Sequence, residues 1–435
     1  MVAEHVDLIL TADAVLTVDA AGTIIEAGAV AIRAGVIVGV GPAADLLARF
    51  DAAEVLESPG CVIAPGWVNT HTHLAMNLFR GAADDVTLEV FLERMIGAEL
   101  STLSAAAVAI GARAGIAECL SGGTTTALDM YWYPRASRAV AAEAGFRLLN
   151  GPTFLGNADP EGRDFAGMLE EARSILTDNR AESPDDDLWV MPHSAYTLSR
   201  DQLESIRELA GQVDARIHTH ASESLGELAL TVQVNGDRPV AVLDAAGLLT
   251  EHTVLAHAVH LTDDEIARIA AAGAAVAHCP MSNLKLGCGI ARLPELLQHG
   301  AAVGLGTDGA ASAGALDMYA AVRMAALLHK GTSNDPTMIS AELAVRLGTV
   351  DGARALGLAD VGTIEPGMQA DLQVVRVDTL NTSPGRDPWS ALAYTATATD
   401  VRHAVARGRI VLRDRVLQTI DEKSALRELS EAAAR

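Results

Sequence analysis

The chain has 435 residues, of which half are hydrophobic and 20% are charged, and it contains 38 glycines. A chain of this length and composition can bury a large core and exceeds the size of one small domain. Its formal net charge of −24 repels phosphate backbones and anionic lipid, so we expect neither nucleic acid nor membrane partners.

Cysteine usage and the start of the chain both favour a reducing compartment. The four cysteines lie far apart without CxxC spacing, which argues against a disulfide framework and against a cysteine zinc site. The first twenty residues lack the cationic segment and the apolar stretch of a secretory signal, and no apolar run reaches membrane-spanning length. We therefore expect a cytoplasmic protein.

Short β-rich runs occupy both ends of the chain. The runs VDLIL, AVLTV, AVAIRAGVIVGVG and CVIAP alternate with Gly and Asp turns near the start, and ADLQVVRV, AVARGRIVLR and DRVLQTI repeat this texture near the end. We predict that residues 1–62 and 363–435 together form a small accessory β-sandwich domain.

Apolar β-like runs alternate with helical segments across residues 63–362. Eight such runs occur in the order WVNTHTH, TTTALDMY, FRLLNGP, LWVMPHS, ARIHTH, HTVLAH, AAVAHCP and AVGLGTD. Continuous apolar strands separated by helices indicate a parallel sheet that is buried on both faces. Eight units in this length predict an α/β fold with a (β/α)8 barrel, the TIM barrel.

Potential metal ligands gather at the ends of these runs. His71 and His73 lie two residues apart, so their side chains point to the same side and can share one ion, although such a pair alone is a weak signal. His220, His257 and Asp308 close the fifth, sixth and eighth runs. The carboxyl ends of barrel strands form one rim, which predicts a divalent metal site with an open position for water.

Motifs along essentially the whole chain resemble the amidohydrolase superfamily. The segments that carry the resemblance are PGWVNTHTHL, HTHASES, LAHAVHL, AHCPMSNLKLG, GLGTDGAAS and IEPGMQADL. Their order and spacing are most similar to the aminohydrolase branch that deaminates S-adenosylhomocysteine, methylthioadenosine and adenosine. The triazine chlorohydrolases are near relatives of this branch.

The resemblance implies a ligand set and a catalytic carboxylate. It assigns the metal to His71, His73, His220 and Asp308. It selects His220 rather than His218 because the catalytic glutamate of the family follows its ligand by three positions, which identifies Glu223.

The lysine inventory bears on the number of metal ions. Superfamily members with two metals bridge them by a carboxylated lysine on the fourth strand, whereas this chain has only Lys285, Lys330 and Lys423. None of them lies near LWVMPHS, so we expect a single ion, with zinc as the first choice and iron as the second.

The expected chemistry is hydrolytic removal of a ring substituent. A bound divalent ion lowers the pKa of its water from about 15.7 toward about 7. Glu223 would take the proton of this water and deliver it to a ring nitrogen. His257 would hydrogen-bond the attacking oxygen, and Asp308 would pass a proton to the departing amine.

Four residues are candidates for substrate contacts. By resemblance, Glu99 falls where a carboxylate contacts ribose hydroxyls and His193 where a histidine contacts the substrate, although Glu99 equally fits an acid on a helix surface. Trp132 could stack on a planar ring, and His278 is expected beside the substrate rather than on the metal.

The leading hypothesis is a deaminase of an aminated nitrogen heterocycle, such as an adenosine-like small molecule. The absence of an arginine in NGPTFLG, after the third run, weakens S-adenosylhomocysteine as the substrate. One alternative is a triazine-type chlorohydrolase that uses the same site, and a remote alternative is a barrel that binds a ligand without catalysis. Because family members are often dimers or larger, a homo-oligomer is left open.

Overall fold

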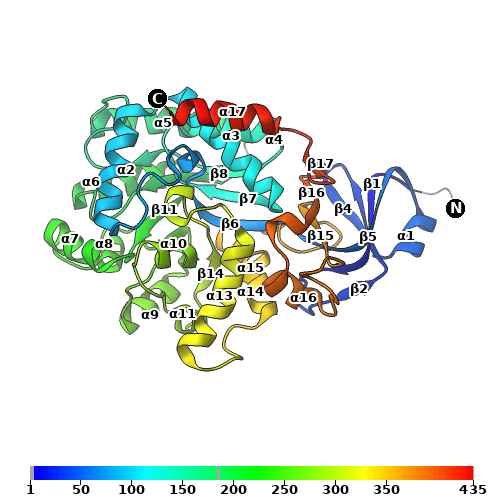
Figure 1. Ribbon diagram of the computed structural model, residues 1–435. Coiled ribbons are helices and arrows are strands. Elements are labelled where there is room, and N and C mark those ends of the chain that lie inside the picture. Colours follow the sequence, from blue (N-terminus) through cyan, green and yellow to red (C-terminus); the bar gives the residue numbers. More distant parts are fainter. Residues whose placement is uncertain (1–3, 184–186, 435) are drawn as a thin grey trace.

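The computed structural model describes residues 4–183 and 187–434. The predicted accessory domain begins at residue 1 and ends at residue 435, and both of these positions lie outside the described ranges. Figure 1 shows a barrel ringed by helices with a twisted sheet on one side of it.

Within the described part of the central region, parallel strands alternate with helices as predicted, which confirms the barrel. The eight barrel strands are β6 (Trp67–Thr72), β7 (Thr124–Asp129), β8 (Arg147–Asn150), β10 (Leu188–Pro192), β11 (Ala215–Ala221), β12 (Thr253–His257), β13 (Ala275–His278) and β14 (Ala302–Leu305). They pair in the orders β6-β7-β8 and β10-β11-β12-β13-β14, and the short β9 (Thr153–Phe154) pairs with β10. Most side chains of these strands are buried, on both faces of the sheet, so the runs lack the alternation of polar and apolar residues that a strand exposed on one face shows.

Backbone hydrogen bonds join the two strand groups into one ring. The amide of Met191 donates to the carbonyl of Pro152 at 2.9 Å, and the amide of Asp308 donates to the carbonyl of His71 at 3.0 Å. The second bond brings the loop after β14 against the end of β6, so residues 237 positions apart in the chain become neighbours.

Helices cover the outside of the barrel. They are α2 (Leu88–Thr102), α3 (Ala105–Ser121), α4 (Pro134–Ala144), α5 (Phe165–Glu182), α6 (Arg200–Val213), α7 (Leu225–Asn235), α8 (Pro239–Ala245), α9 (Asp263–Ala272), α10 (Pro280–Lys285), α11 (Leu293–Gln298), α12 (Ala310–Ala313), α13 (Met318–Ser333), α14 (Ala341–Leu347) and α15 (Val350–Ala355). Local sequence sets several of their ends, since capping boxes begin α6 at Ser199 and α9 at Thr262. None of the described helices combines the length and apolarity needed to cross a bilayer.

Strands from both ends of the chain lie in one nine-stranded sheet. They are β1 (Glu4–Leu16), β2 (Ile24–Glu26), β3 (Gly28–Arg33), β4 (Val36–Pro42), β5 (Phe50–Pro65), β15 (Leu372–Arg376), β16 (Val401–Ala406), β17 (Arg409–Arg413) and β18 (Val416–Leu417). The long strand β5 joins the two ends, because it pairs with β1 on one side and with β15 on the other. All nine strands belong to one hydrogen-bonded sheet, and the sandwich arrangement stays a prediction.

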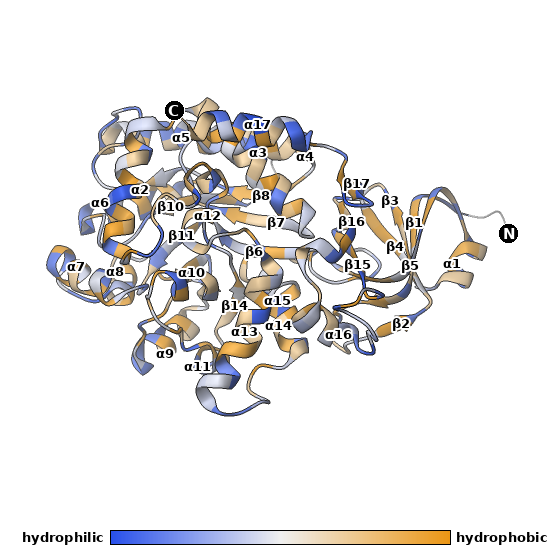
Figure 2. Cartoon of the chain, viewed as in Figure 1, coloured by the Kyte–Doolittle hydropathy of each residue, from blue (hydrophilic) through white to orange (hydrophobic). Residues whose placement is uncertain are grey.

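The C-terminal helix lies apart from this sheet. The helix α17 (Glu422–Ala433) packs along α3 of the barrel, where Arg113 pairs with Glu428 at 3.1 Å. In Figure 2 the nine-stranded sheet is coloured mainly hydrophobic, whereas hydrophilic residues are prominent on α17. The predicted range 363–435 therefore contains a segment that the fold places on the barrel, because an amphipathic helix buries its apolar side on whichever surface is adjacent.

Candidate active site

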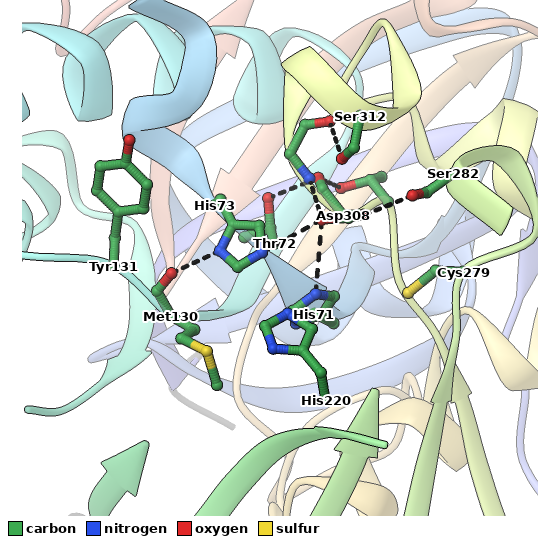
Figure 3. A network of polar contacts seen from close by, with 12 residues as sticks. His71, Thr72, His73, Met130, Tyr131, His220, Cys279, Ser282, Asp308 and Ser312 are labelled. Atoms are coloured by element: carbon green, nitrogen blue, oxygen red, sulfur yellow. Dashed lines mark hydrogen bonds and ion pairs between the residues drawn. The ribbon is translucent and has the colours of Figure 1, made fainter. Parts of the chain in front are cut away.

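The ends of four barrel strands bring the predicted metal-site residues together. His71 and His73 lie at the end of β6, His220 lies in β11, His257 ends β12, and Asp308 follows β14. All five side chains are nearly inaccessible to solvent, and Figure 3 shows His71, His73, His220 and Asp308 converging on one point. The structure thus gathers the residues that the sequence placed at one rim.

Backbone carbonyls orient two of the imidazoles. The Nδ1–H of His73 donates to the carbonyl of Met130 at 2.6 Å, and the Nδ1–H of His220 donates to the carbonyl of His193 at 2.8 Å. A carbonyl can only accept, so each ring carries its proton on Nδ1. In both neutral rings the lone pair is therefore on Nε2, which is the atom that faces the site.

Side chains orient the other two imidazoles. The Nδ1 of His218 donates to the carbonyl of Val254 at 3.0 Å, which leaves its Nε2 to accept from Nδ1 of His71 at 2.8 Å. The Nδ1 of His257 donates to Oδ1 of Asn283 at 2.9 Å. As a result, the Nε2 lone pairs of His71 and His257 also point inward, whereas His218 uses its own Nε2 to orient His71.

The inward atoms are close enough to share one ion. One ligand atom each from His71, His73 and His220 lies within 4.8 Å of the others, and the same is true of His71, His257 and Asp308. Oδ1 of Asp308 is 3.6 Å from Nε2 of His71 and 3.3 Å from Nε2 of His73. Nε2 of His71 has no hydrogen-bond partner among the described residues. A buried, unpartnered imidazole nitrogen among three other nitrogen and oxygen donors fits a divalent metal.

Burial and the neighbouring side chains keep His71 and Asp308 in the protonation states that a metal ion requires. Burial lowers the pKa of His71 to about 3, so this imidazole is neutral at pH 7. Burial alone would raise the pKa of Asp308, but the nearby imidazoles of His71, His73 and His257 hold that pKa well below its usual range. Ser282 Oγ donates to the other carboxylate oxygen of Asp308 at 2.5 Å. At neutral pH the His71 imidazole is therefore uncharged and the Asp308 carboxylate is ionised, so both can bind a metal ion.

Glu223 stands beside this group with a pKa suited to proton transfer. Its Oε1 lies 3.8 Å from Nε2 of His257, and the thiol of Cys288 donates to the same oxygen at 3.7 Å. Burial, followed by the negative charge of Asp308, raises the pKa of Glu223 to about 8. A carboxylate with a pKa near the working pH can both take up and release a proton.

A cavity opens above the donor set and is apolar over most of its wall. Its apolar lining comprises Met76, Leu88, Phe91, Leu92, Met95, Ile96, Met130, Leu155 and Leu286. The acidic side chains at the wall are Glu99, Glu223 and Asp308, and no lysine or arginine is among the described residues that line it. A pocket with this lining favours a largely uncharged ligand.

Glu99 projects into the cavity from α2. It is only 6% exposed, so the alternative interpretation as a surface acid is wrong. Tyr131 Oη donates to Glu99 at 2.7 Å, and the indole N–H of Trp132 donates to its other oxygen at 3.3 Å. Burial raises the pKa of Glu99. Trp132 lines the cavity and also holds the Glu99 carboxylate.

The two remaining histidine candidates lie in different places. His193 lines the cavity, and its ring centroid is 4.6 Å from that of His220. His278 is not among the described lining residues, and its ring lies 5.6 Å from that of His329 on α13. Alternate residues of a strand face opposite sides, so a strand-end position alone does not decide which way a side chain points.

Several residues with roles in the site were not predicted as such. They are His218, Ser282, Asn283, Cys288 and Glu227. His218 stood in the HTH segment and Ser282 and Asn283 stood in PMSN, so their motifs pointed to the region. The partners of His218, Ser282, Asn283 and Cys288 are distant in the sequence, so spacing could not reveal them. Glu227 differs, because it accepts from the amides of Ser222 and Glu223 in the adjacent turn.

Barrels that gather imidazoles and a carboxylate at the carboxyl ends of their strands are typical of metal-dependent hydrolases. The model of the amidohydrolase family matches residues 62–411 of this sequence. The chain belongs to the amidohydrolase family.

Curated relatives match over almost their full length. A 5-methylthioadenosine/S-adenosylhomocysteine deaminase of Halobacterium salinarum is 39% identical over 412 residues, which cover 92% of this chain and 93% of the relative. A 5'-deoxyadenosine deaminase of Methanothermobacter thermautotrophicus is 38% identical over 407 residues, which cover 92% of this chain and 94% of the relative.

Solved structures with the same fold include zinc proteins. An adenosine deaminase from Xanthomonas campestris with bound zinc is 35% identical, with a TM-score of 0.95 and coverage of 100% of this chain and 99% of that chain. An atrazine chlorohydrolase from Arthrobacter aurescens in complex with zinc is 24% identical, with a TM-score of 0.89 and coverage of 98% and 100%. The second likeness concerns the fold alone.

Proposed function

We propose that this protein is a metal-dependent hydrolase that deaminates an adenosine-like nucleoside, replacing the ring amine with oxygen and releasing ammonia. The observation that carries the proposal is the position of Glu223, 3.8 Å from His257 at the wall of an open cavity and beside the donor set. The relatives named as deaminases of 5-methylthioadenosine and 5'-deoxyadenosine support the substrate class.

We infer that the donor set of His71, His73, His220 and Asp308 holds a single zinc ion. Three nitrogen donors and one oxygen donor suit zinc, and a structural relative carries zinc. No lysine lies on β10 to bridge a second ion. A zinc ion held there would lower the pKa of a bound water and so provide the nucleophile. Iron is the alternative that metal analysis would detect.

Glu223, His257 and Asp308 each have a separate role in moving or holding protons during the reaction. Glu223 takes a proton from the attacking water and gives it to the ring nitrogen next to the reacting carbon, which lowers the cost of attack. His257, oriented by Asn283, hydrogen-bonds the attacking oxygen. Asp308 takes the second proton from the attacking oxygen and passes it to the departing amine, so that the ring carbon becomes a carbonyl and ammonia leaves. Each such transfer contributes about 10² to 10⁴ in rate.

The lining of the cavity favours nucleosides that carry no carboxylate. Glu99 is placed to accept hydrogen bonds from sugar hydroxyls, and Trp132 and His193 line the same space. A carboxylate on the substrate would meet an apolar wall and three acidic side chains with no described lysine or arginine to pair with it. Methylthioadenosine and 5'-deoxyadenosine therefore fit better than S-adenosylhomocysteine.

A release assay tests this proposal. Ammonia is measured for the purified enzyme with adenosine, 5'-deoxyadenosine, methylthioadenosine, S-adenosylhomocysteine, aminopurines and aminotriazines, chloride is measured with chlorotriazines, and metal content is determined on the same sample. Ammonia from the uncharged nucleosides supports the proposal. Chloride release in place of ammonia, or zinc-replete protein that binds nucleosides without turnover, would overturn it.

Two expectations from the sequence, a cytoplasmic location and a homo-oligomeric state, stay predictions. Sedimentation of the purified protein would determine the second.

A further inference from the structure

A second buried glutamate, Glu227, lies next to the candidate proton-transfer group. It belongs to the first turn of α7 and is only 3% exposed. Its two carboxylate oxygens accept from the backbone amides of consecutive residues, Ser222 at 3.0 Å and Glu223 through a short hydrogen bond. Its own amide donates to Ser224 Oγ, the N-cap of the same helix, at 3.0 Å. Glu227 therefore contacts the backbone of Glu223 rather than its side chain.

The segment that Glu227 holds has an unusual backbone. Ser222 has a φ of 56°, in the left-handed region that residues other than glycine seldom occupy. The carbonyl of Ser222 accepts from the amides of Val259 and His260 at 3.0 and 2.8 Å, which ties the turn to the loop after β12. A conformation of this kind persists only where surrounding contacts impose it, and the Glu227 carboxylate supplies two of them.

A carboxylate is the side chain that these contacts require. Two N–H groups point at two oxygens, and a carboxylate accepts at both. A glutamine of the same shape would turn an NH2 group toward one of the two amides and leave that buried donor unpaired, which costs about 1–3 kcal/mol.

We propose that Glu227 is a positioning residue for the reaction: it fixes the turn between β11 and α7 and thereby the place of the Glu223 carboxylate relative to His257. This inference rests on the proposed function, because it concerns the proton transfers assigned to Glu223. A displacement of about 1 Å at a reacting group costs about 100-fold in rate, so the effect falls on turnover rather than on substrate affinity.

The experiment compares E227Q with a matched control, E265Q. Glu265 occupies the same helix position in α9 and is 4% exposed. Its carboxylate accepts from the amide of Thr262 and from Arg238 at 2.8 Å, and none of these contacts reaches a residue assigned to the reaction. We expect E227Q to lower kcat at least about 10-fold with KM and metal content within twofold of wild type, and E265Q to leave kcat unchanged. An unchanged kcat in E227Q, or an equal fall in both variants, would overturn the inference.

A double-mutant cycle with E223Q distinguishes a positioning role of Glu227 from a general loss of stability. If Glu227 acts through Glu223, adding E227Q to E223Q causes no further loss of turnover, whereas an additive loss refutes this route. Should E227Q not fold, E227D is measured instead, since it shifts the carboxylate by one methylene: a fall in kcat at constant KM supports the inference, and unchanged kcat overturns it. Absence of ammonia release by wild type would contradict the proposed function. The inference about Glu227 is judged separately, by the ratio of variant to wild-type turnover on whichever substrate of the release assay wild type converts, with ammonia or chloride as the product measured.

Discussion

The cavity makes Glu99 the most informative position to perturb. E99Q removes the charge of a buried carboxylate that accepts from Tyr131 at 2.7 Å and from Trp132 at 3.3 Å. If substrate hydroxyls also bind there, the variant loses charge-assisted hydrogen bonds worth about 1.5–3 kcal/mol. This loss corresponds to a decrease of about 10- to 150-fold in kcat/KM for a ribonucleoside.

The assay must separate sugar binding from disturbance of the pocket. Ammonia release is measured for adenosine and for 2',3'-dideoxyadenosine with wild type, with E99Q and with E93Q, an exposed site on the same helix α2. We expect the E99Q penalty with adenosine to shrink to within about threefold for the dideoxy substrate, because that substrate has no hydroxyls to lose contact with Glu99. The E93Q variant should behave as wild type with both.

An equal penalty with both substrates would refute the assignment of Glu99 to the sugar. It would mean that the carboxylate serves only to order Tyr131 and Trp132 at the cavity wall. A penalty confined to 2',3'-dideoxyadenosine would contradict the reasoning even more directly.

Three further predictions concern the metal site and its surroundings. Removal of the metal by a chelator should abolish ammonia release, and zinc at about 100 times its dissociation constant should restore it and add about 2.7 kcal/mol to the free energy of unfolding; activity without metal would contradict this. H218L should weaken zinc affinity about 10- to 100-fold in a competition assay, because His71 loses the acceptor of its Nδ1–H, and unchanged affinity would count against this role. Burial lowers the pKa of His278 to about 3. Below pH 6.5 this imidazole is therefore protonated in the unfolded chain but stays neutral in the folded protein. The free energy of unfolding of metal-free protein should therefore fall with decreasing pH between 6.5 and 4, and H278Q should flatten that slope by about 1.4 kcal/mol per pH unit in urea titrations; an identical slope would argue against the buried, neutral state.

Local spacing made much of the site predictable. The step of two from His71 to His73 puts both side chains on one side of a strand. Glu223 was identified through the resemblance of HTHASES to the amidohydrolase superfamily. The carboxyl ends of barrel strands lie on one rim, so the sequence alone could group residues that are widely separated along the chain. The barrel itself followed from the alternation of apolar runs and helical segments.

Contacts between distant segments decided the rest. Sequence left Glu99 open between a helix surface and the cavity, and only the packing of α2 over the barrel mouth buries it against Tyr131 and Trp132. His278 shares the strand-end position of its neighbours, yet its ring lies against His329.

The sequence by itself determined which residue types could bind a metal and on which rim they lie, because strand period and motif spacing are local properties. Only the tertiary structure decided the protonated nitrogen of each imidazole and the partners of Glu223. Those depend on atoms from other strands, such as the carbonyl of Met130 for His73 and the thiol of Cys288 for Glu223. Hydrogen-bond partners are set by distances in space, which no spacing along the chain records.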